Sequence, residues 1–264
     1  MFSIYSAAYN IQKFKFNYTK NIRNWCDFVG NDGQVVIAVN TSEDDTWNEL
    51  CYIKKYLLNL ELIQTSIPYT NNRFDGMIKQ SALSKCISPV RCLMDLDEVF
   101  PRYNKDKWSQ AASFLTKSPY DGLLLPVLDL WGNEKHIKKQ NIGQKFRLHK
   151  RNVRRGVWRR AELPNGKFDT TMSDSTEPIL ADGELAYFSS MIHPEYLKYE
   201  NSSILSDFPF VIHEGYLDFD KRIDINKNFW KSAWEDRSGK EENVVIEKSD
   251  LEKTEVWEHG LRLY

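Results

Sequence analysis

Cysteine is scarce in this sequence, and its spacing does not suit a zinc site. The 264 residues contain four cysteines, none of which forms a Cys-x-x-Cys pair. No histidine has zinc-site spacing to them. Three of the four lie in segments with an apolar pattern, so we expect reduced, buried thiols of an intracellular protein. They are Cys26, Cys51, Cys86 and Cys92.

Long apolar runs are also missing. No stretch approaches the roughly 18 apolar residues that a membrane span needs. The opening MFSIYSAAYN has neither the basic region nor the apolar run of a signal peptide. We therefore expect a cytoplasmic protein without a transmembrane segment, and peripheral attachment to a membrane stays an open alternative.

An excess of charge of one sign is absent as well. The 36 Lys and Arg residues balance 37 Asp and Glu residues, which argues against wholesale binding to nucleic acid or to an acidic membrane. The sequence has no internal repeat and no low-complexity linker. Since 41% of its residues are hydrophobic and 28% are charged, it has the composition of a soluble globule, and we expect one compact domain with two lobes.

What is present is a regular alternation of strand and helix patterns over the first hundred residues. QVVIAVN, residues 34–40, is an uninterrupted apolar run, as expected for a strand that is buried on both faces of a sheet. The alternation predicts an α/β fold with a mostly parallel sheet flanked by helices. The expected order is a strand within 1–10, a helix over 18–30, a strand over 34–40, a helix over 47–59, a strand over 60–67, a helix over 75–88 and a strand over 90–97.

Beyond residue 100 the pattern is looser. A helix is expected over 105–117, a strand over 120–132, a short strand ending at His213 and a Trp-rich helix over 227–236. A basic segment, 135–160, contains eleven Lys or Arg residues and no acid. Its arginines either form a solvated face or contact phosphate groups; they include Arg147, Arg151, Arg154 and Arg155. The other histidines are expected at the surface: His136, His149, His193 and His259.

The stretch RCLMDLDEVFPRY, residues 91–103, ends an apolar strand in a cluster of acids that includes Asp95 and Asp97. The spacing alone says little, because a second Asp-x-Asp occurs at Asp218 and Asp220, which we expect to be solvated or paired with the Lys-Arg that follows. The first pair, however, lies at the carboxyl end of a predicted strand. Ligands bind at such ends in α/β sheets.

Polar residues also follow the first two strands, so three polar strand ends converge on one rim of the predicted sheet. Side chains two apart on an extended strand point the same way, which lets Asp95 and Asp97 share one task. Carboxylate oxygens are the ligands that Mg²⁺ and Mn²⁺ prefer. The sequence therefore predicts a metal site at this rim.

These features resemble the nucleotide-sugar-binding half of a GT-A glycosyltransferase, closest to the family 2 pattern. Tyr9-Asn10 stands where the first strand ends in that family, and VNTSEDDT, 39–46, loosely matches its second turn. GMIKQSALSKCISPVRCLMDLDEVF, 76–100, follows the layout that ends in the family's Asp-x-Asp motif. FVIHEGYLDFDKRI, 210–223, is similar to a late His-x-Gly-Tyr segment. The sequence departs from the family at Asn40-Thr41, where an aspartate often stands.

The resemblance implies a GT-A-like, Rossmann-like fold with a nucleotide-sugar-binding lobe at 1–132. An acceptor-binding lobe with C-terminal helices would follow at 133–264. The implied reaction is an inverting transfer of a hexose or related sugar from a UDP- or GDP-sugar to a hydroxyl of a glycan or another acceptor. Mn²⁺ or Mg²⁺ is the implied cofactor, since negative charge grows on the diphosphate as the glycosidic bond breaks.

The resemblance also implies roles for individual residues. Asp97 would chiefly bind the metal, Asp95 would contact the ribose or a metal-bound water, and His213 would be a further metal ligand. Residues expected to contact the nucleotide are Tyr9, Asn10, Asn40, Lys79, Asp95 and Arg155.

Inverting transfer needs a base that deprotonates the acceptor hydroxyl. The family places an Asp or Glu in the second lobe for this task. Asp174 and Glu177 are the candidates that we favour here, Asp174 first, and the sequence does not separate them from Asp182 and Glu184.

Three other functions compete with this interpretation. A nucleotidyltransferase uses a related sheet, but it usually opens with a Gly-rich, basic loop, and SAAYNIQKFK lacks the glycines. A nucleic-acid-binding module could be built around 135–160, with affinity that falls steeply with salt. A relative without activity could serve as a scaffold for a partner, although both aspartates of the motif are retained.

Overall fold

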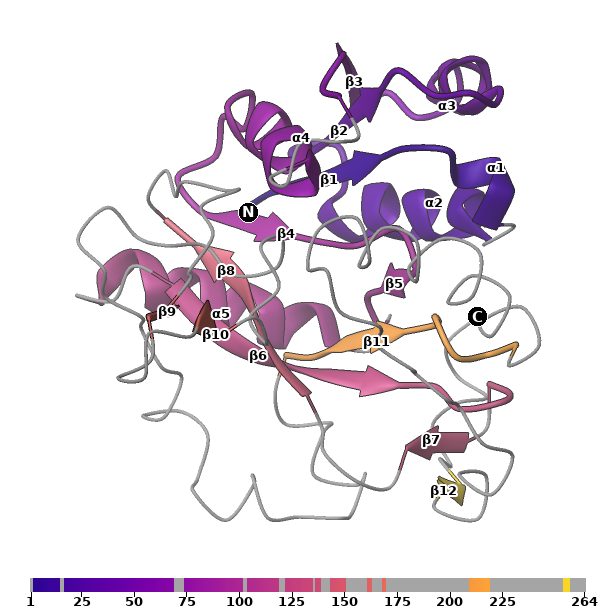
Figure 1. Cartoon of the computed structure of the whole chain (residues 1–264). Helices are drawn as coiled ribbons and strands as arrows, with labels where there is room; N and C mark the ends of the chain where they lie inside the picture. The colour runs from indigo at the N-terminus through magenta and orange to yellow at the C-terminus, as the bar shows by residue number, and fades with distance from the viewer. Residues whose placement is uncertain are drawn as a thin grey trace.

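The structure is a computed structural model in which an eight-stranded sheet occupies the centre (Figure 1). The strands of this sheet are β1 (Ser3–Ala8), β2 (Gln34–Asn40), β3 (Leu60–Thr65), β4 (Arg91–Leu93), β5 (Glu98–Val99), β6 (Gly122–Asp129), β8 (Gly143–His149) and β11 (Val211–His213). The residues that the structure describes are 2–14, 17–68, 74–101, 104–118, 122–134, 136–138, 143–150, 161–162, 168–169, 209–218 and 254–256.

Helices and short strand pairs complete this part of the chain. The helices are α1 (Ile11–Phe14), α2 (Tyr18–Val29), α3 (Thr46–Lys54), α4 (Phe74–Leu83) and α5 (Lys105–Lys117). Two small antiparallel pairs join β7 (His136–Lys138) to β12 (Thr254–Val256) and β9 (Ala161–Glu162) to β10 (Phe168–Asp169). No helix in the described ranges is long and apolar enough to cross a membrane.

The sheet has the order β3-β2-β1-β4-β8-β6-β11-β5. The first four strands are parallel, with Ile4 of β1 opposite Val35 on one side and opposite Cys92 on the other. β8 then runs antiparallel between β4 and β6, and β11 runs parallel to β6. The predicted α/β fold, with a mostly parallel sheet flanked by helices, is confirmed.

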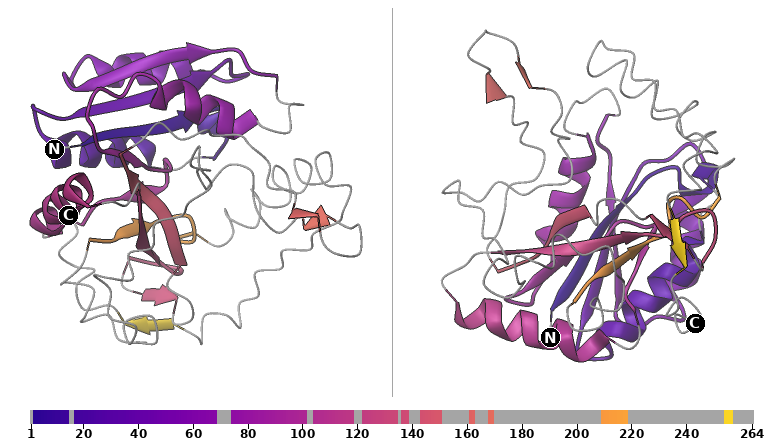
Figure 2. Two further views of the ribbon diagram at one scale, coloured as in Figure 1. Left: turned by 90° about the vertical axis from the view of Figure 1, so that its left-hand side faces the viewer. Right: turned by 90° about the horizontal axis from the view of Figure 1, so that it is seen from below.

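Helices cover both faces of the sheet, which explains the uninterrupted apolar run of β2. Val35 and Ile37 point into one core, which they share with the inner faces of α2, α3 and α5. Val36 and Ala38 point into a second core beneath α4. Figure 2 shows α2 and α5 on the opposite side of the sheet from α4. Because residues on both faces of β2 contact apolar side chains, the sequence of β2 does not alternate between polar and apolar residues.

Helix α2 illustrates how the local sequence sets an element's end. Ile22, Trp25 and Cys26 are buried on its inner face. The helix stops at Gly30, whose φ of 70° and ψ of −171° suit glycine alone. The Asn59 side chain donates hydrogen bonds of 2.9 Å to the carbonyls of Cys26 and Gly30, which caps the helix end.

Several predicted boundaries were wrong. The helix predicted over 47–59 ends at Lys54, and the one predicted over 75–88 spans Phe74–Leu83. The strand predicted over 90–97 ends at Leu93, because the next residues form a turn in which the Glu98 N–H donates to the Asp95 carbonyl at 2.9 Å. The strand predicted over 120–132 is shorter, at Gly122–Asp129.

The second half of the chain contributes to the same sheet. Strands β8 and β11 lie beyond residue 132 in sequence, and both pair within the central sheet. The division into lobes at 1–132 and 133–264 stays a prediction. The predicted helix over 227–236 lies outside the described residues.

The four cysteines are free thiols, as expected. Cys26, Cys86 and Cys92 are buried, whereas Cys51 is partly exposed, so the expectation of burial was wrong for that residue. Burial is the main reason that the pKa values of Cys26 and Cys86 are raised to about 12. These thiols are therefore poor nucleophiles, and they serve as small core residues.

Candidate active site

The acids that follow β4 lie in a tight turn at the rim of the sheet. The Met94 N–H still pairs with the Tyr5 carbonyl at 3.1 Å, but the chain then leaves the sheet. The Asp95 N–H donates to Glu98 Oε2 at 3.0 Å, which closes the turn. Because this segment is a turn and not an extended strand, the carboxylates of Asp95 and Asp97 face different partners.

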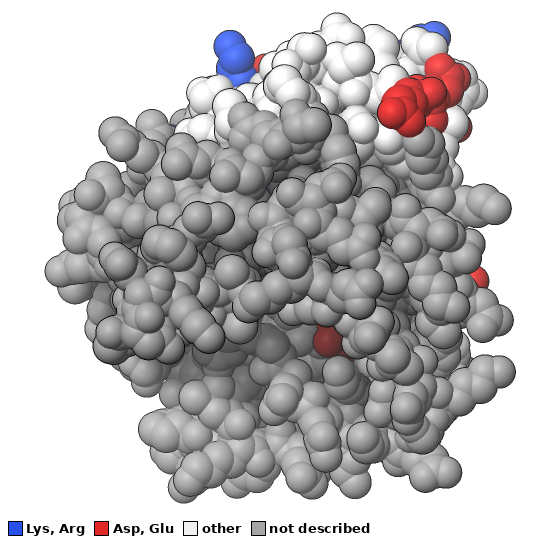
Figure 3. Space-filling model, viewed as in Figure 1, with Lys and Arg blue, Asp and Glu red and all other residues white. Residues whose placement is uncertain are grey.

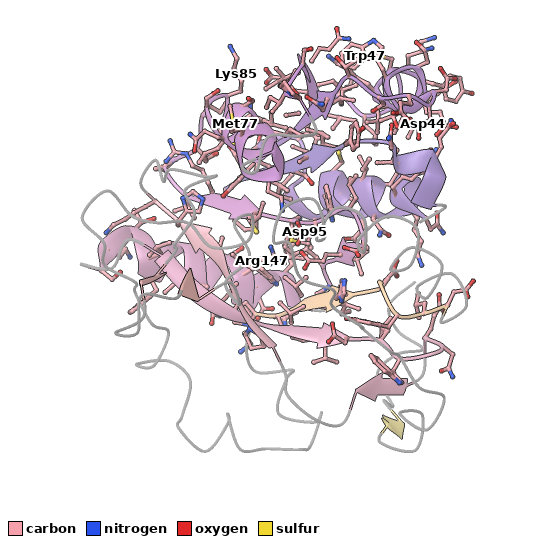
Figure 4. All side chains as sticks on the ribbon, in the orientation of Figure 1. Asp44, Trp47, Met77, Lys85, Asp95 and Arg147 are labelled. Carbon is pink, nitrogen blue, oxygen red and sulfur yellow. The ribbon has the colours of Figure 1, made fainter. Side chains whose placement is uncertain are left out.

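Asp95 belongs to a group of four charged side chains, which we call the Asp95 cluster: Lys79, Asp95, Glu98 and Arg147. Its Oδ1 lies 2.9 Å from Lys79 Nζ of α4, and its Oδ2 lies 3.1 Å from Arg147 Nη2 of β8. The same Nη2 contacts Glu98 Oε1. Figure 4 shows Asp95 and Arg147 side by side below β4. The cluster contains two positive and two negative side chains, so their formal charges cancel.

The Asp95 cluster is buried, so this balance matters for stability. Arg147 and Glu98 are fully buried, and Lys79 is nearly so. Burial works against the charged guanidinium, but Glu98 and Asp95 outweigh it and raise the pKa of Arg147 above its ordinary value. Its Nε and Nη1 have no hydrogen-bond partner in the described part of the chain. A buried charge of this kind is tolerated only while its counter-charges remain in place.

Asp97 belongs to a second group, the Asp97 cluster, which consists of Asp97, Asp129 and His213. His213 Nε2 lies 3.0 Å from Asp97 Oδ2, and His213 Nδ1 lies 2.6 Å from Asp129 Oδ1. The side chains are 11% exposed for His213, 16% for Asp97 and 25% for Asp129, so the cluster opens to solvent at one side.

Strand pairing explains how residues so distant in sequence meet. His213 ends β11 and Asp129 ends β6, and the two are direct partners in the parallel pair. The Glu214 N–H donates to the Asp97 carbonyl at 2.7 Å, which fixes the acidic turn against the end of β11. The Asp97 cluster therefore stands on the carboxyl ends of two parallel strands, the usual place for ligands in such sheets.

The charges around His213 favour its protonated form. Burial lowers the pKa of the ring, but Asp97 and Asp129 outweigh burial through their charges and hydrogen bonds, and the pKa is raised to about 10. The two carboxylates therefore favour positive charge on the ring.

Gly215 lies close against the side chains of His213 and Asp97. A Cβ on Gly215 would lie 2.5 Å from His213 Nε2 and 2.9 Å from Asp97 Oδ2, distances too short for any side chain. Beside it, the Tyr216 ring meets His213 edge-on, with ring centroids 5.5 Å apart. Tyr216 in turn packs on Trp131 at 4.7 Å. The Glu-Gly-Tyr sequence after His213 therefore shapes the site directly.

The Asp97 cluster suits a divalent cation that arrives together with a diphosphate. Within the described ranges, no three side chains of His, Cys, Asp or Glu are arranged to hold a metal ion by themselves. Mg²⁺ is commonly held by one or two carboxylates together with substrate phosphates. Neighbouring ligands of an octahedral ion, with bonds of about 2.1 Å, are about 3.0 Å apart. The separation of Asp97 Oδ2 and His213 Nε2, 3.0 Å, fits that geometry.

The metal role predicted for Asp95 stays a prediction. Its two carboxylate oxygens lie within ion-pair distance of Lys79 and Arg147, as described above. The nucleotide contact predicted for Lys79 likewise stays a prediction; its ammonium group lies beside Asp95.

Hydrogen bonds join the turn after β1 to the loop after β2, so the ends of these two strands lie close together. Asn10 has a φ of 48°, a left-handed conformation that asparagine tolerates better than most residues. Its side-chain Oδ1 accepts a hydrogen bond of 2.8 Å from the Glu43 N–H, and its own N–H donates to Ser42 Oγ at 3.1 Å. Tyr9 packs against the core beneath α4. The predicted nucleotide contacts of Tyr9 and Asn10 stay predictions.

Asn40 has a structural task at the end of β2. Its Oδ1 accepts hydrogen bonds from the Ile67 N–H at 2.7 Å and from Thr65 Oγ1 at 2.9 Å. Its Nδ2 donates to the Ile67 carbonyl at 3.0 Å. The amide thus holds the chain that follows β3, whether or not it also faces a nucleotide.

An acidic surface lies next to this loop. Figure 3 shows Asp and Glu side chains gathered at the upper right of the molecule, and Asp44, labelled in Figure 4, lies there at the start of α3. Asp44 accepts a hydrogen bond of 3.1 Å from the Gln12 N–H, so the carboxylate supports the turn after β1.

Two expectations for the basic segment were wrong. Arg147 is not part of a solvated face, because β8 carries it into the sheet beside Asp95 and Glu98. His149 is not at the surface; it is fully buried, and its Nε2 lies 2.9 Å from the Tyr5 hydroxyl. Both side chains leave the same side of β8, which places them next to β4 and β1.

Several predicted residues lie outside the described residues. They are Arg151, Arg154, Arg155, His193, Asp220 and His259, the candidate bases Asp174 and Glu177, and the alternatives Asp182 and Glu184.

Sequence reasoning gave no role to Glu98, which belongs to the acidic cluster, or to Gly215 of the His-x-Gly-Tyr segment, and it missed Asp129. Asp129 lies within the strand predicted over 120–132, and it ends β6 in the structure, so attention to the strand's true end would have found it by the rule used for the other strand ends.

No family model matches the sequence, and no curated protein matches it. Similar solved structures include residues 1–349 of S. aureus TarS in complex with UDP-GlcNAc, with 21% identity over 50% of this chain and 35% of that one, and a TM-score of 0.39. The mannosyltransferase PcManGT from Pyrobaculum calidifontis, in complex with GDP-Man and Mn²⁺, is 14% identical over 56% of this chain and 44% of that one, with a TM-score of 0.41.

Another similar structure is glucosyl-3-phosphoglycerate synthase from Mycobacterium tuberculosis, in complex with Mn²⁺, UDP and phosphoglyceric acid. It is 12% identical over 48% of this chain and 42% of that one, with a TM-score of 0.31. The chain thus covers less than half the length of each of these three structures.

Proposed function

We propose that this chain is a metal-dependent glycosyltransferase of the GT-A type. It transfers a sugar, with inversion, from a nucleotide diphosphate sugar to an acceptor hydroxyl. The observation that carries the proposal is the meeting of Asp97 and His213, 116 residues apart in sequence, with ligand atoms 3.0 Å apart at the carboxyl ends of the sheet.

Asp97 and His213 are the residues that would hold Mn²⁺ or Mg²⁺. The cation would neutralise the negative charge that grows on the diphosphate leaving group. Asp97 supplies a carboxylate oxygen and His213 supplies Nε2, which leaves the remaining coordination positions to phosphate oxygens and water. Gly215 has no side chain that would overlap these two atoms.

The chain's other residues would position the donor. The turn at Tyr9-Asn10 and the loop after Asn40 border the rim on the β1 and β2 side, where the nucleoside would lie. Lys79 places a positive charge at the same rim, held by Asp95. The arginines of the basic segment, Arg155 among them, are proposed diphosphate contacts.

The base that deprotonates the acceptor hydroxyl is proposed to be Asp174 or Glu177. A carboxylate can take this proton when it lies within hydrogen-bond reach of the hydroxyl. We propose a UDP- or GDP-sugar as the donor and a glycan or another hydroxyl compound as the acceptor.

The proposal is tested by thermal unfolding against UDP-, GDP-, dTDP- and CMP-sugars, each with Mn²⁺ or with EDTA. A donor at 100 times its dissociation constant adds about 2.7 kcal/mol of stability, enough to raise the unfolding temperature measurably. We expect a shift with one donor class that requires both Mn²⁺ and Asp97, and that is therefore lost in Asp97→Ala.

Glu61→Ala is the matched control, because Glu61 is a partly buried acid of β3, at the opposite edge of the same sheet. It should keep the donor-induced shift. No shift with any donor, together with salt-sensitive retention of DNA or RNA, would contradict the transferase proposal and favour nucleic-acid binding by the basic segment.

A further inference from the structure

His213 has two carboxylate partners. Asp97, the proposed metal ligand, lies at Nε2, and Asp129 lies at the other ring nitrogen, Nδ1. We propose that Asp129 is a positioning residue of the metal site: it holds the Nδ1 side of the His213 ring and directs Nε2 toward Asp97. This inference rests on the proposed function, because it assigns a role within the same site.

The contact between Asp129 and His213 is short and is built by the sheet. Asp129 Oδ1 lies 2.6 Å from His213 Nδ1. The two residues are register partners on β6 and β11, and the Leu130 N–H donates to the His213 carbonyl at 3.0 Å. Both side chains therefore stand on paired strands, which hold functional groups more accurately than loops do.

The ring is held from several sides, so its orientation is defined. Asp129 contacts one nitrogen, Asp97 faces the other, and Tyr216 packs edge-on against the ring. Gly215 lies so close to Nε2 and Cε1 that no side chain fits between them. Rotating the ring by half a turn would take Nδ1 away from Asp129 and would point a carbon at Asp97.

The chemistry of a metal-binding imidazole calls for such a partner. A ligating histidine almost always donates its other N–H to a carboxylate or a carbonyl. The acceptor fixes the tautomer, so that the lone pair lies on the nitrogen that faces the metal. A carboxylate acceptor also makes the imidazole a stronger base and hence a stronger ligand. Asp129 meets this requirement for Nε2 of His213.

The test measures Mn²⁺ binding directly, by the loss of the free Mn²⁺ signal in electron paramagnetic resonance. Mn²⁺ is titrated alone and with UDP or GDP into the wild type, Asp129→Asn and Asp129→Ala. Loss of such a partner typically weakens metal affinity about 10- to 100-fold. We expect that loss for Asp129→Ala and a smaller one for Asp129→Asn, which keeps an acceptor oxygen of the same size.

Controls separate positioning from folding. Glu61→Gln makes the same change from carboxylate to amide in β3, far along the sheet, and should bind Mn²⁺ as the wild type does. Binding of UDP or GDP in EDTA should be equal in all variants, because a residue that positions a metal ligand affects only the metal-dependent part of nucleotide binding. If Asp129→Ala does not fold, the nearly isosteric Asp129→Asn carries the comparison.

The outcomes also distinguish this inference from the proposed function. Wild-type Mn²⁺ affinity in both Asp129 variants, with loss in Asp97→Ala and His213→Ala, overturns the role of Asp129 and leaves the metal site intact. Absence of Mn²⁺ binding to the wild type under all conditions overturns it too. In that case, binding of a nucleotide sugar in EDTA would overturn the metal dependence of the proposed function but leave sugar transfer from a nucleotide donor standing, whereas its absence would end both proposals.

Discussion

Single residues decide whether the two halves of the proposed metal site can meet. Asp97 comes from a turn after β4 and His213 from the end of β11, and one buried residue lies against both side chains. That residue is Gly215, which follows His213 by two positions. Its lack of a side chain is required by space and not by backbone conformation, since a Cβ would overlap both ligand atoms.

We therefore predict that Gly215→Ala abolishes Mn²⁺-dependent donor binding. The added methyl group must displace the His213 ring or the Asp97 carboxylate, and such overpacking typically costs about 1–3 kcal/mol of stability. Urea unfolding and the donor-induced thermal shift measure the two effects.

Gly30→Ala is the matched control for this prediction. Its Cβ would meet nothing within 4 Å, but its φ of 70° is strained for alanine, with a cost of about 1–3 kcal/mol. It should lose stability and keep Mn²⁺-dependent binding. Retention of that binding in Gly215→Ala would mean that the ligand pair lies elsewhere.

At the scale of the elements, the ends of strands hold the parts of the rim together. The end of β2 shows this best, because the Asn40 amide satisfies both the N–H and the carbonyl of Ile67. An aspartate could accept from that N–H, but its second oxygen would face the carbonyl oxygen. The departure from the family pattern at this position therefore has a local structural reason.

We predict that Asn40→Asp destabilises the protein by about 1–3 kcal/mol, the usual cost of leaving a buried polar group without a suitable partner. Asn40→Ala should cost a similar amount, because it leaves the Ile67 N–H without its acceptor. Chemical denaturation measures both. If Asn40→Asp is as stable as the wild type and binds the donor more tightly, Asn40 serves the nucleotide and its contact with Ile67 is secondary.

Elements with a clear local pattern were predictable from the sequence, and elements defined by distant partners were not. β2 and α5 have the predicted bounds, 34–40 and 105–117, because an apolar run and a helical face are local features. β8 was missed because its cations resemble a solvated segment. Arg147 is buried only because Asp95 and Glu98, about fifty residues earlier, compensate its charge.

The same distinction applies to the candidate site. The resemblance predicts Asp97 and His213 as metal ligands, a role that stays a prediction, and the structure brings the two side chains to 3.0 Å of each other. The separate environment of Asp95 could not be predicted, because it depends on the turn that follows Leu93 and on the position of β8. Asp129 could have been found, since it ends a strand that neighbours β11 in the sheet.

At the scale of the whole molecule, one buried charge cluster joins the parallel half of the sheet to the strands that follow it. Lys79 comes from α4, Asp95 and Glu98 flank the turn after β4, and Arg147 comes from β8. β8 is the strand that connects β4 to β6, and so connects the first four strands to the strands that carry Asp129 and His213. The cluster therefore lies where the two parts of the rim meet.

We predict that Arg147→Met lowers the free energy of unfolding by about 3–5 kcal/mol, because it leaves Asp95 and Glu98 in a buried site without their shared cation. Arg147→Lys should cost less, since it keeps a positive charge but not the planar fork. Lys54→Met, on the exposed side of α3, should stay within about 0.5 kcal/mol of the wild type. Guanidinium unfolding measures all three.

Loss of Arg147 should also weaken Mn²⁺-dependent donor binding, because the turn that carries Asp97 is held by Glu98 and Asp95 on one side and by Glu214 on the other. If Arg147→Met is destabilised but binds the donor with unchanged affinity, the Asp95 cluster is a stability element alone. If neither property changes, β8 is not held against β4 by this charge cluster, and the junction of the sheet depends on apolar packing around Leu148 and Cys92, which are register partners in the two strands.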